Sequence, residues 1–288
     1  MREIRRAPCR LSPVSRDLSW HGEPFVMDWR SLLTPRAPIP RSFQICLGFG
    51  GFALILLIWW GVTWLGLIQP FFLPRPDQVL RSGYALFAEL DFLADIWAST
   101  YRILLGFLVA GLLGVPLGLL MGTFRAAEAL FEPLVGFVRY MPASAFIPLF
   151  ILWLGIGDLE KVAIIFVGSF FQLALMVTVV ARAVPMEIME TAYTLGASRM
   201  QVILRVLLPA SMPGILDTLR IIMGWAWTYI IVAELVASEA GLGYRILNSQ
   251  RLLQTGNIIF SIITIGVLGL LTDLGFKWLQ RKLFPWTE

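Results

Sequence analysis

The chain has 288 residues, of which 58% are hydrophobic and only 15% charged, and its net charge is +4. Soluble domains are about 45–50% apolar, so the composition excludes an ordinary soluble domain. Recurring runs of about twenty apolar residues instead predict one polytopic membrane domain. Its single histidine, His21, excludes a centre built on two histidines, and no lysine follows a glycine, which excludes a phosphate-binding G-x-x-x-x-G-K-[ST] loop.

Residues 1–44 form a basic arm with eight arginines and several prolines, which interrupt any helix. We predict a largely disordered cytoplasmic arm. It is not a secretory signal peptide, because no apolar core follows its first charges. Either Met1 or Met27 is the translation start. The two cysteines, Cys9 and Cys46, have no spacing typical of a disulfide framework or a metal site.

Six apolar runs follow the arm, and they predict an all-α membrane protein with six transmembrane helices. Their limits are about 45–67, 100–122, 130–152, 161–183, 214–238 and 258–276. Lys and Arg gather on the side of the arm, at Arg125, Arg182, Arg199, Arg205, Lys277, Arg281 and Lys282. The other side has only Arg75, Arg81, Lys161, Arg245 and Arg251. The positive-inside rule therefore places both termini and the segment 184–213 in the cytoplasm.

The second run has a small residue at every fourth position. These residues share one helix face and allow another backbone to approach closely, so we interpret them as a packing surface rather than a pore lining. They are Gly106, Ala110, Gly114, Gly118 and Gly122. In the preceding connection, 68–99, Asp77 is expected to cap a short amphipathic helix along the outer membrane surface.

The segment 184–213 is polar and interrupts the apolar pattern. Residues 187–195 predict a short helix, Gly196 a turn and Ser198 the cap of a second helix. Pro209 and Pro213 are expected to close this unit before the fifth span. The residues alone leave two interpretations open, an amphipathic connector lying on the membrane or a docking element for a partner.

The spacing within this segment resembles the E-A-A, three, G, nine, I, one, L-P loop of ABC importer permeases. The matching positions are Glu190, Thr191, Ala192, Gly196, Val206, Leu208 and Pro209, with Thr191 and Val206 departing from the usual residues. LPRPDQVL, LLGFLVAGLLGVPLGLLMG, FIPLFILWLGIGDLEK, VAELVASEAGLGYRI and RKLFPW are similar to the permeases for nitrate, sulfonate, taurine and bicarbonate. Together they cover residues 73–286 in the expected order.

The resemblance implies the architecture of a type I ABC importer permease in a bacterial inner membrane. Segment 184–213 would form the coupling helix that docks on a separate ATPase subunit, with Glu190 in contact, Gly196 at the bend and Ala192, Ala197 and Ser198 keeping the surface small. The implied partners are two ATPase subunits, an external solute-binding protein, a second permease copy and a small anionic substrate. No catalytic residue, cofactor, metal or nucleic acid is expected in this subunit.

Several charged residues fall within or near the apolar runs, where they must face protein or water. Arg139, followed by Tyr140 and Met141, is a candidate for the translocation path. Glu234 is either a buried hydrogen-bonded anchor or part of that path. Arg102 is expected to extend to the outer interface and Asp273 to the inner one, and Asp217 and Arg220 can pair within their helix.

Two other classes of protein remain as alternatives at this stage. A membrane-embedded enzyme would present clustered His, Cys or paired acids near one membrane face, and none is visible. A secondary transporter would more often have internal repeats and unwound mid-membrane helices, and the sequence has no convincing repeat.

Overall fold

The computed structural model describes residues 40–236 and 238–287, all of them helix, turn or loop. Most of the basic arm, including Cys9, His21 and Met27, therefore lies outside the described residues. The chain divides into two units, residues 1–55 and 56–288. Helix α2 (Arg41–Trp64) crosses the boundary between them. In the second unit the indole of Trp59 donates a hydrogen bond of 3.1 Å to the carbonyl of Pro74, which ties the end of α2 to the connection that follows.

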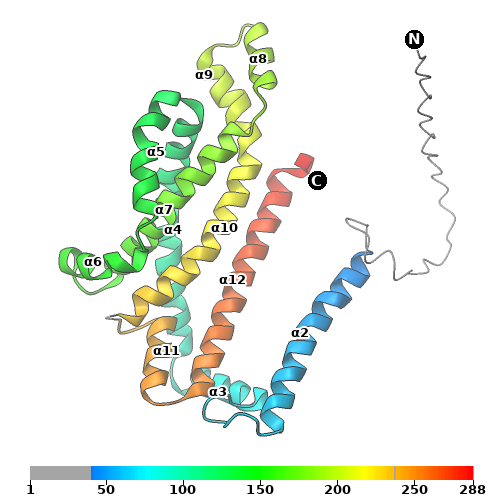
Figure 1. The fold of residues 1–288 in the computed structure, drawn as a ribbon, viewed down its shortest axis with the longest axis vertical. Coiled ribbons are helices and arrows are strands. Elements are labelled where there is room, and N and C mark those ends of the chain that lie inside the picture. The colour runs from blue at the N-terminus through cyan, green and yellow to red at the C-terminus, as the bar shows by residue number, and fades with distance from the viewer. Residues whose placement is uncertain (1–39, 237, 288) are drawn as a thin grey trace, which may run out of the picture. The chain divides into compact units, whose positions relative to one another are not determined.

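The second unit is a bundle of long and short helices (Figure 1). Five described helices are long and apolar enough to cross a membrane, or six if one sharply bent pair counts as a span. The helices after α2 are α3 (Pro76–Glu89), α4 (Phe92–Thr123), α5 (Arg125–Arg139), η1 (Ala143–Phe146), α6 (Ile147–Leu154), α7 (Asp158–Arg182), α8 (Met186–Thr194), α9 (Arg199–Val202), the π-helical η2 (Ile203–Leu207), α10 (Leu208–Leu235), α11 (Leu242–Arg251), α12 (Thr255–Leu283) and η3 (Pro285–Thr287).

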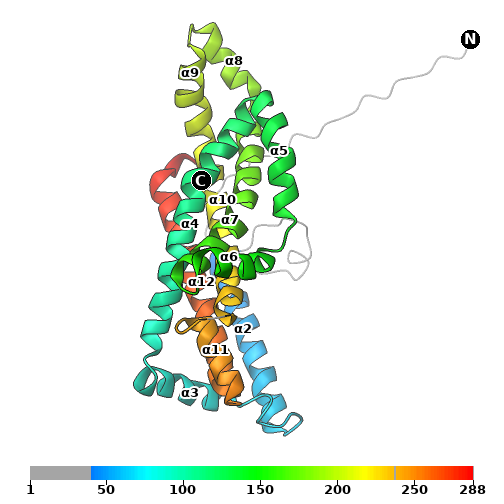
Figure 2. The same cartoon turned by 90° about the vertical axis from the view of Figure 1, so that its left-hand side faces the viewer.

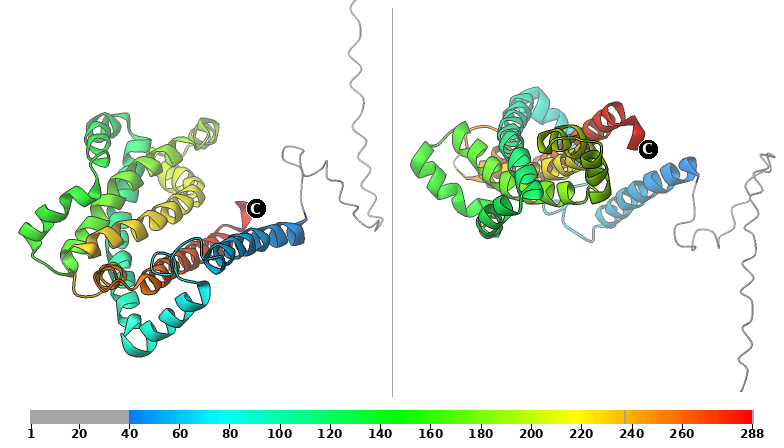
Figure 3. Two further views of the ribbon diagram at one scale, coloured as in Figure 1. Left: turned by 60° about the horizontal axis from the view of Figure 1, so that its bottom comes forward. Right: turned by 90° about the horizontal axis from the view of Figure 1, so that it is seen from above.

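The centre of the bundle is formed by α7, which packs against both α4 and α10 (Figures 1 and 3). The stripe of small residues on α4 makes this packing possible. A Cβ added at Gly118 would lie 2.5 Å from the carbonyl oxygen of Ala174, and one at Gly106 would lie 2.7 Å from Ile165. The prediction that the stripe is a packing surface is therefore confirmed, and α7 is the helix that it meets.

The predicted third span, 130–152, is not one helix. Helix α5 ends at Arg139, and η1 and α6 continue in a direction bent by 85°. Two prolines explain the break. Pro142 disfavours helical backbone at the preceding residue, and Pro148 occupies the first turn of α6, where its missing N–H costs nothing.

The predicted closure of the polar segment by Pro209 and Pro213 is wrong, because α9, η2 and α10 run on as one helical stretch. Pro209 cannot donate to the carbonyl of Arg205, and its ring would clash with that carbonyl in a regular helix. The backbone widens instead, so that Leu208 N–H bonds to Ile203 O, five residues back. Both prolines are thus accommodated within the fifth span.

Helices α3 and α11 lie at the end of the bundle opposite α8 and α9 (Figures 1 and 2). Val79 and Leu86 of α3 are buried, and α3 packs against α12, whereas Tyr84 is exposed. The cap predicted at Asp77 is wrong. Arg75 is the N-cap residue, Pro76 opens the helix, and the Arg75 backbone N–H donates to the side chain of Gln78.

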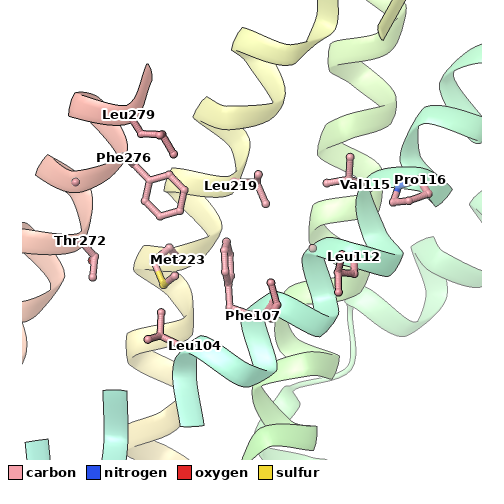
Figure 4. A pocket seen from close by; sticks show the side chains of 13 residues that line it. Leu104, Phe107, Leu112, Val115, Pro116, Leu219, Met223, Thr272, Phe276 and Leu279 are labelled. Atoms are coloured by element: carbon pink, nitrogen blue, oxygen red, sulfur yellow. The ribbon is translucent and has the colours of Figure 1, made fainter. Parts of the chain in front are cut away.

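A groove of about 760 Å³ separates parts of α4, α10 and α12. Figure 4 shows Phe107, Leu219, Met223 and Phe276 around it, and Thr272 is the only residue with a polar side chain among the thirteen that line it. A charged solute would find no charged partner here. The groove is therefore unsuited to an ionic substrate.

Candidate functional site

The bend between α8 and α9 is a Schellman turn, in which the two residues after the C-cap, here Leu195, bond back to carbonyls of the last helical turn. Gly196 has φ +85° and donates its N–H to Tyr193 O at 2.9 Å, while Ala197 donates to Ala192 O at 3.0 Å. This left-handed conformation favours glycine, because a side chain there would crowd the backbone. No atom lies within 4 Å of a Cβ built at Gly196, so the backbone conformation alone requires the glycine.

Ser198 caps α9, as predicted from the sequence. Its hydroxyl accepts from Gln201 N at 3.4 Å, and the side chain of Gln201 accepts from Ser198 N at 2.8 Å. This reciprocal capping box fixes the direction in which the chain leaves the turn. Thr191, which stands where the family loop usually has alanine, fits within α8, because its hydroxyl donates to Glu187 O at 2.7 Å.

The tip of this helical pair, which projects from one end of the bundle (Figure 2), presents both charge and apolar surface. Glu190 and Thr191 are exposed, and Ala192 and Ala197 are half-buried. Three large apolar side chains are mostly exposed beside them, with relative exposures of 83% for Leu195, 63% for Met200 and 54% for Leu204. Met200 and Leu204 therefore point away from the bundle, whereas Leu207, in the next turn, is buried against it.

The base of the helical pair is held by the bundle. Val202 and Leu207 are buried, and Val206 and Leu208 are half-buried where η2 runs into α10. Arg182, the last residue of α7, forms an ion pair with Glu128 of α5. The α8–α9 helical pair is thus fixed at its base, while its tip stays exposed.

The structure separates the four residues predicted for a translocation path. Arg139, Tyr140 and Met141 lie together at the break between α5 and η1. The guanidinium of Arg139 donates to the hydroxyl of Tyr140 at 2.8 Å and lies 4.6 Å from the centre of its ring. Glu234 lies elsewhere, close to the end of α10.

Glu234 is completely buried, and its carboxylate accepts hydrogen bonds from three residues on two other helices. Ser99 Oγ donates to it at 2.8 Å, Arg102 Nη1 at 2.7 Å and Gly243 N at 2.9 Å. These contacts join α4, α10 and the start of α11. A buried carboxylate with this many donors is well compensated for the loss of water.

The prediction that Arg102 extends to the membrane interface is wrong. Its residue exposure is 6%, and Arg102 Nε donates to Asp158 at 2.7 Å in addition to the contact with Glu234. Sequence reasoning also missed Asp95, which accepts from Gly241 N at 2.9 Å and pairs with Arg245 of α11. The available signal was the i, i+4, i+7 spacing of Asp95, Ser99 and Arg102, which puts three polar residues on one face of α4.

A second cluster of charged and polar residues joins α10 to α12. Asp217 and Arg220 lie 3.6 Å apart within α10, as predicted, and Gln280 of α12 donates to Asp217 at 3.0 Å. Asp273 Oδ1 lies 3.5 Å from Arg220 Nε and Asp273 Oδ2 lies 2.7 Å from Lys277 Nζ; its position at the inner interface stays a prediction. All these groups are partly exposed, so the contacts are individually weak.

Comparison with known proteins gives the family. The family described as binding-protein-dependent transport system inner membrane component matches residues 114–287. The chain is 36% identical over 252 residues to the taurine transport system permease protein TauC of Escherichia coli (strain K12), covering 86% of this chain and 92% of that protein. It is 34% identical over 234 residues to the aliphatic sulfonates transport permease protein SsuC of Bacillus subtilis (strain 168), covering 81% and 85%.

Solved structures agree on the fold. The inward-facing MetNI methionine ABC transporter matches with a TM-score of 0.62 at 20% identity, covering 68% of this chain and 98% of that chain. At this identity the likeness concerns the fold alone. Together with the sequence matches it shows that the chain belongs to the family of inner-membrane permease subunits of binding-protein-dependent ABC importers, in which the ATPase is a separate subunit.

Proposed function

We propose that this permease imports a small anion of the sulfonate type and is driven through the α8–α9 tip by two ATPase subunits. The named substrates of its relatives support the first part, since one transports taurine and another aliphatic sulfonates. In this arrangement a solute-binding protein delivers the anion from outside, and a second copy of the chain completes the path.

The tip is the part of the chain best suited to receive an ATPase subunit. Leu195, Met200 and Leu204 expose apolar surface next to the charge of Glu190, and in the proposed orientation this surface lies in the cytoplasm, outside the lipid, where clustered apolar side chains favour binding of a partner. The Schellman turn and the capping box give it a fixed shape. This observation carries the proposal, because a rigid exposed tip can pass a partner's movement into the bundle.

The distribution of charge supports an orientation in which the tip and both termini face the cytoplasm. Arg199 and Arg205 lie in the tip segment, and Arg281 and Lys282 lie in the last turn of α12. The opposite end of the bundle, with α3 and α11, carries fewer basic residues in its connections. The basic residues near the tip would then stay on the cytoplasmic side.

Within the bundle we assign different roles to the two candidate path regions. Arg139, Tyr140 and Met141 contribute to the translocation path at the break in the third span. Glu234 serves as an anchor, because its carboxylate is committed to Ser99, Arg102 and Gly243 and has no exposed surface. The alternative in which Glu234 meets the substrate would require those bonds to open.

The test is transport by the reconstituted assembly. The permease is purified together with its ATPase subunits and binding protein and placed in liposomes, and ATP-dependent uptake of labelled taurine and ethanesulfonate is measured. Glu190→Ala should weaken ATPase assembly and uncouple hydrolysis from uptake, whereas Glu187→Ala, one turn earlier on the same helix, serves as the matched control. Normal assembly and normal uptake with Glu190→Ala would refute the coupling role.

A further inference from the structure

The break between α5 and η1 holds an arginine without an acidic partner. Within residues 40–236 and 238–287, the ion pairs are formed by basic residues other than Arg139. The exposed guanidinium of Arg139 instead hydrogen-bonds to the hydroxyl of the neighbouring Tyr140 and lies over its ring. Arg102, Arg182 and Arg220, which lie in other spans, each pair with a carboxylate. A charge within a membrane-spanning region must face water, protein or a ligand, and Arg139 is left available for an anion.

Two cavities meet at this break, and Tyr229 of α10 lines both. The smaller, of about 70 Å³, is also lined by Arg139, Gln172 and Trp225. The larger, of about 250 Å³, is also lined by Ser144 and Thr228. Since α10 runs away from the tip, the larger cavity lies farther from the tip than the smaller one. Tyr229 thus lies between two spaces that follow one another along the span.

The lining of the two cavities has one charge, and its sign is positive. Arg139 is the only charged residue among the lining residues, which otherwise offer the hydroxyl and amide groups of Ser144, Thr228, Tyr229 and Gln172. A guanidinium presents paired N–H groups that match two oxygens of one head group. The chemistry favours a monoanion whose charge is spread over several oxygens.

The position of the Tyr229 ring depends on a glycine of α7. A Cβ at Gly168 would lie 2.7 Å from two carbons of that ring, so the ring lies directly on the α7 backbone. Trp225, one turn earlier on α10, is 52% exposed and lines the cavity that contains Arg139. The Tyr229 ring is therefore packed against the α7 backbone, beside the cavity that Arg139 lines.

We infer that the break between α5 and η1 is an oxyanion-binding site, in which Arg139 takes the head group of a small sulfonate-like monoanion and Tyr229 separates the inner cavity from the outer one. Gln172, Ser144 and Thr228 supply hydrogen bonds on either side of the ring. The inference rests on the proposed function for its substrate class, and it adds the site and the head-group chemistry.

The experiment measures the electrostatic preference of the cavity with thiol reagents of opposite charge. The full chain, with Cys9→Ser and Cys46→Ser, is placed in nanodiscs, and Thr228→Cys is introduced in the larger cavity. The rates of labelling by anionic sulfonatoethyl and cationic trimethylammonioethyl methanethiosulfonate are compared. In water, a unit charge roughly 8 Å from a thiol would change this rate ratio about fivefold, so we expect Arg139→Gln to lower the ratio by a factor of that order.

Three further variants make the result specific. Arg125→Gln removes the same charge from the other end of α5 and should leave the ratio unchanged. Arg139→Lys should keep the ratio but reduce the protection that methanesulfonate gives against labelling, because an ammonium lacks the paired donors. Gly168→Ala, which displaces the Tyr229 ring, should also weaken protection without altering the ratio.

A change of less than twofold in the ratio with Arg139→Gln would overturn the inference, as would protection by methanesulfonate that does not depend on Arg139. The labelling requires neither ATP nor a partner. An Arg139-dependent ratio combined with no ATP-driven uptake by the assembled complex would therefore refute the proposed function and leave the site standing. Normal ATP-driven uptake combined with a labelling ratio that Arg139→Gln leaves unchanged would refute the binding site and leave the proposed function standing.

Discussion

Removing the carboxylate of Glu234 should destabilise the corner where α4, α10 and α11 meet. Glu234→Ala deletes the acceptor for Ser99, Arg102 and Gly243 at once. Arg102 is then left buried with one fewer partner. Truncating one member of a buried ion pair costs about 3–5 kcal/mol.

The remaining contacts of Arg102 place the expected cost at the lower end of that range. Its guanidinium still bonds to Asp158 at 2.7 Å and to the carbonyl of Ala240 at 2.8 Å. We therefore expect a loss of about 3 kcal/mol, which corresponds to a fall in apparent melting temperature of about 6–12 °C at ~2–4 °C per kcal/mol.

The assay is thermal unfolding of the purified permease in detergent, followed by the fraction that remains monodisperse after heating. Glu239→Ala is the matched control, because Glu239 is an exposed acid in the loop that follows α10. In a double-mutant cycle, Glu234→Ala with Arg102→Ala should cost less than the sum of the two single changes. A shift of under 2 °C for Glu234→Ala, or strictly additive costs, would refute the anchor role.

The other predictions concern packing, the tip and the partly exposed ion pairs. Gly118→Val should lower the melting temperature strongly, since its side chain would meet the α7 backbone at 2.5 Å. Gly136→Val is the control for the intrinsic cost of valine in a helix, because no atom lies within 4 Å of a Cβ built at Gly136. Gly196→Ala should cost about 1–2 kcal/mol at the tip and speed amide hydrogen exchange there; unchanged exchange would contradict the Schellman assignment. Asp273→Asn should alter the stability of the α10–α12 contact by less than about 1 kcal/mol, and a melting shift above 5 °C would show that this estimate is wrong.

The sequence was sufficient for the helical class, the small-residue packing face and the turn at Gly196, because each depends on local periodicity or on the conformation of one residue. Helix limits were less predictable. The second span was expected from about residue 100, whereas α4 begins at Phe92. Asp95 and Arg102 look like the end of a span in a hydropathy pattern, but partners distant in sequence pair them inside the bundle.

The effect of Pro209 was wrongly predicted for a related reason. Pro142 and Pro209 have the same local effect, the loss of a donor and a clash with a preceding carbonyl. At Pro142 the chain bends by 85°, and at Pro209 it widens into a π-helical turn and continues. The choice depends on the helices packed around each proline, which a single sequence does not display.

The continuity of α9, η2 and α10 has a geometric consequence. No loop separates the exposed tip from the aromatic face of α10. A rotation about the base of the tip therefore displaces that face in proportion to its distance from the base. Tyr229 lies roughly 32 Å along the axis from Leu208 at ~1.5 Å per residue, so a tilt of about 5° moves its backbone by about 3 Å. A displacement of that size is comparable to the diameter of a water molecule, and it would open or close the space between the two cavities without any change in secondary structure.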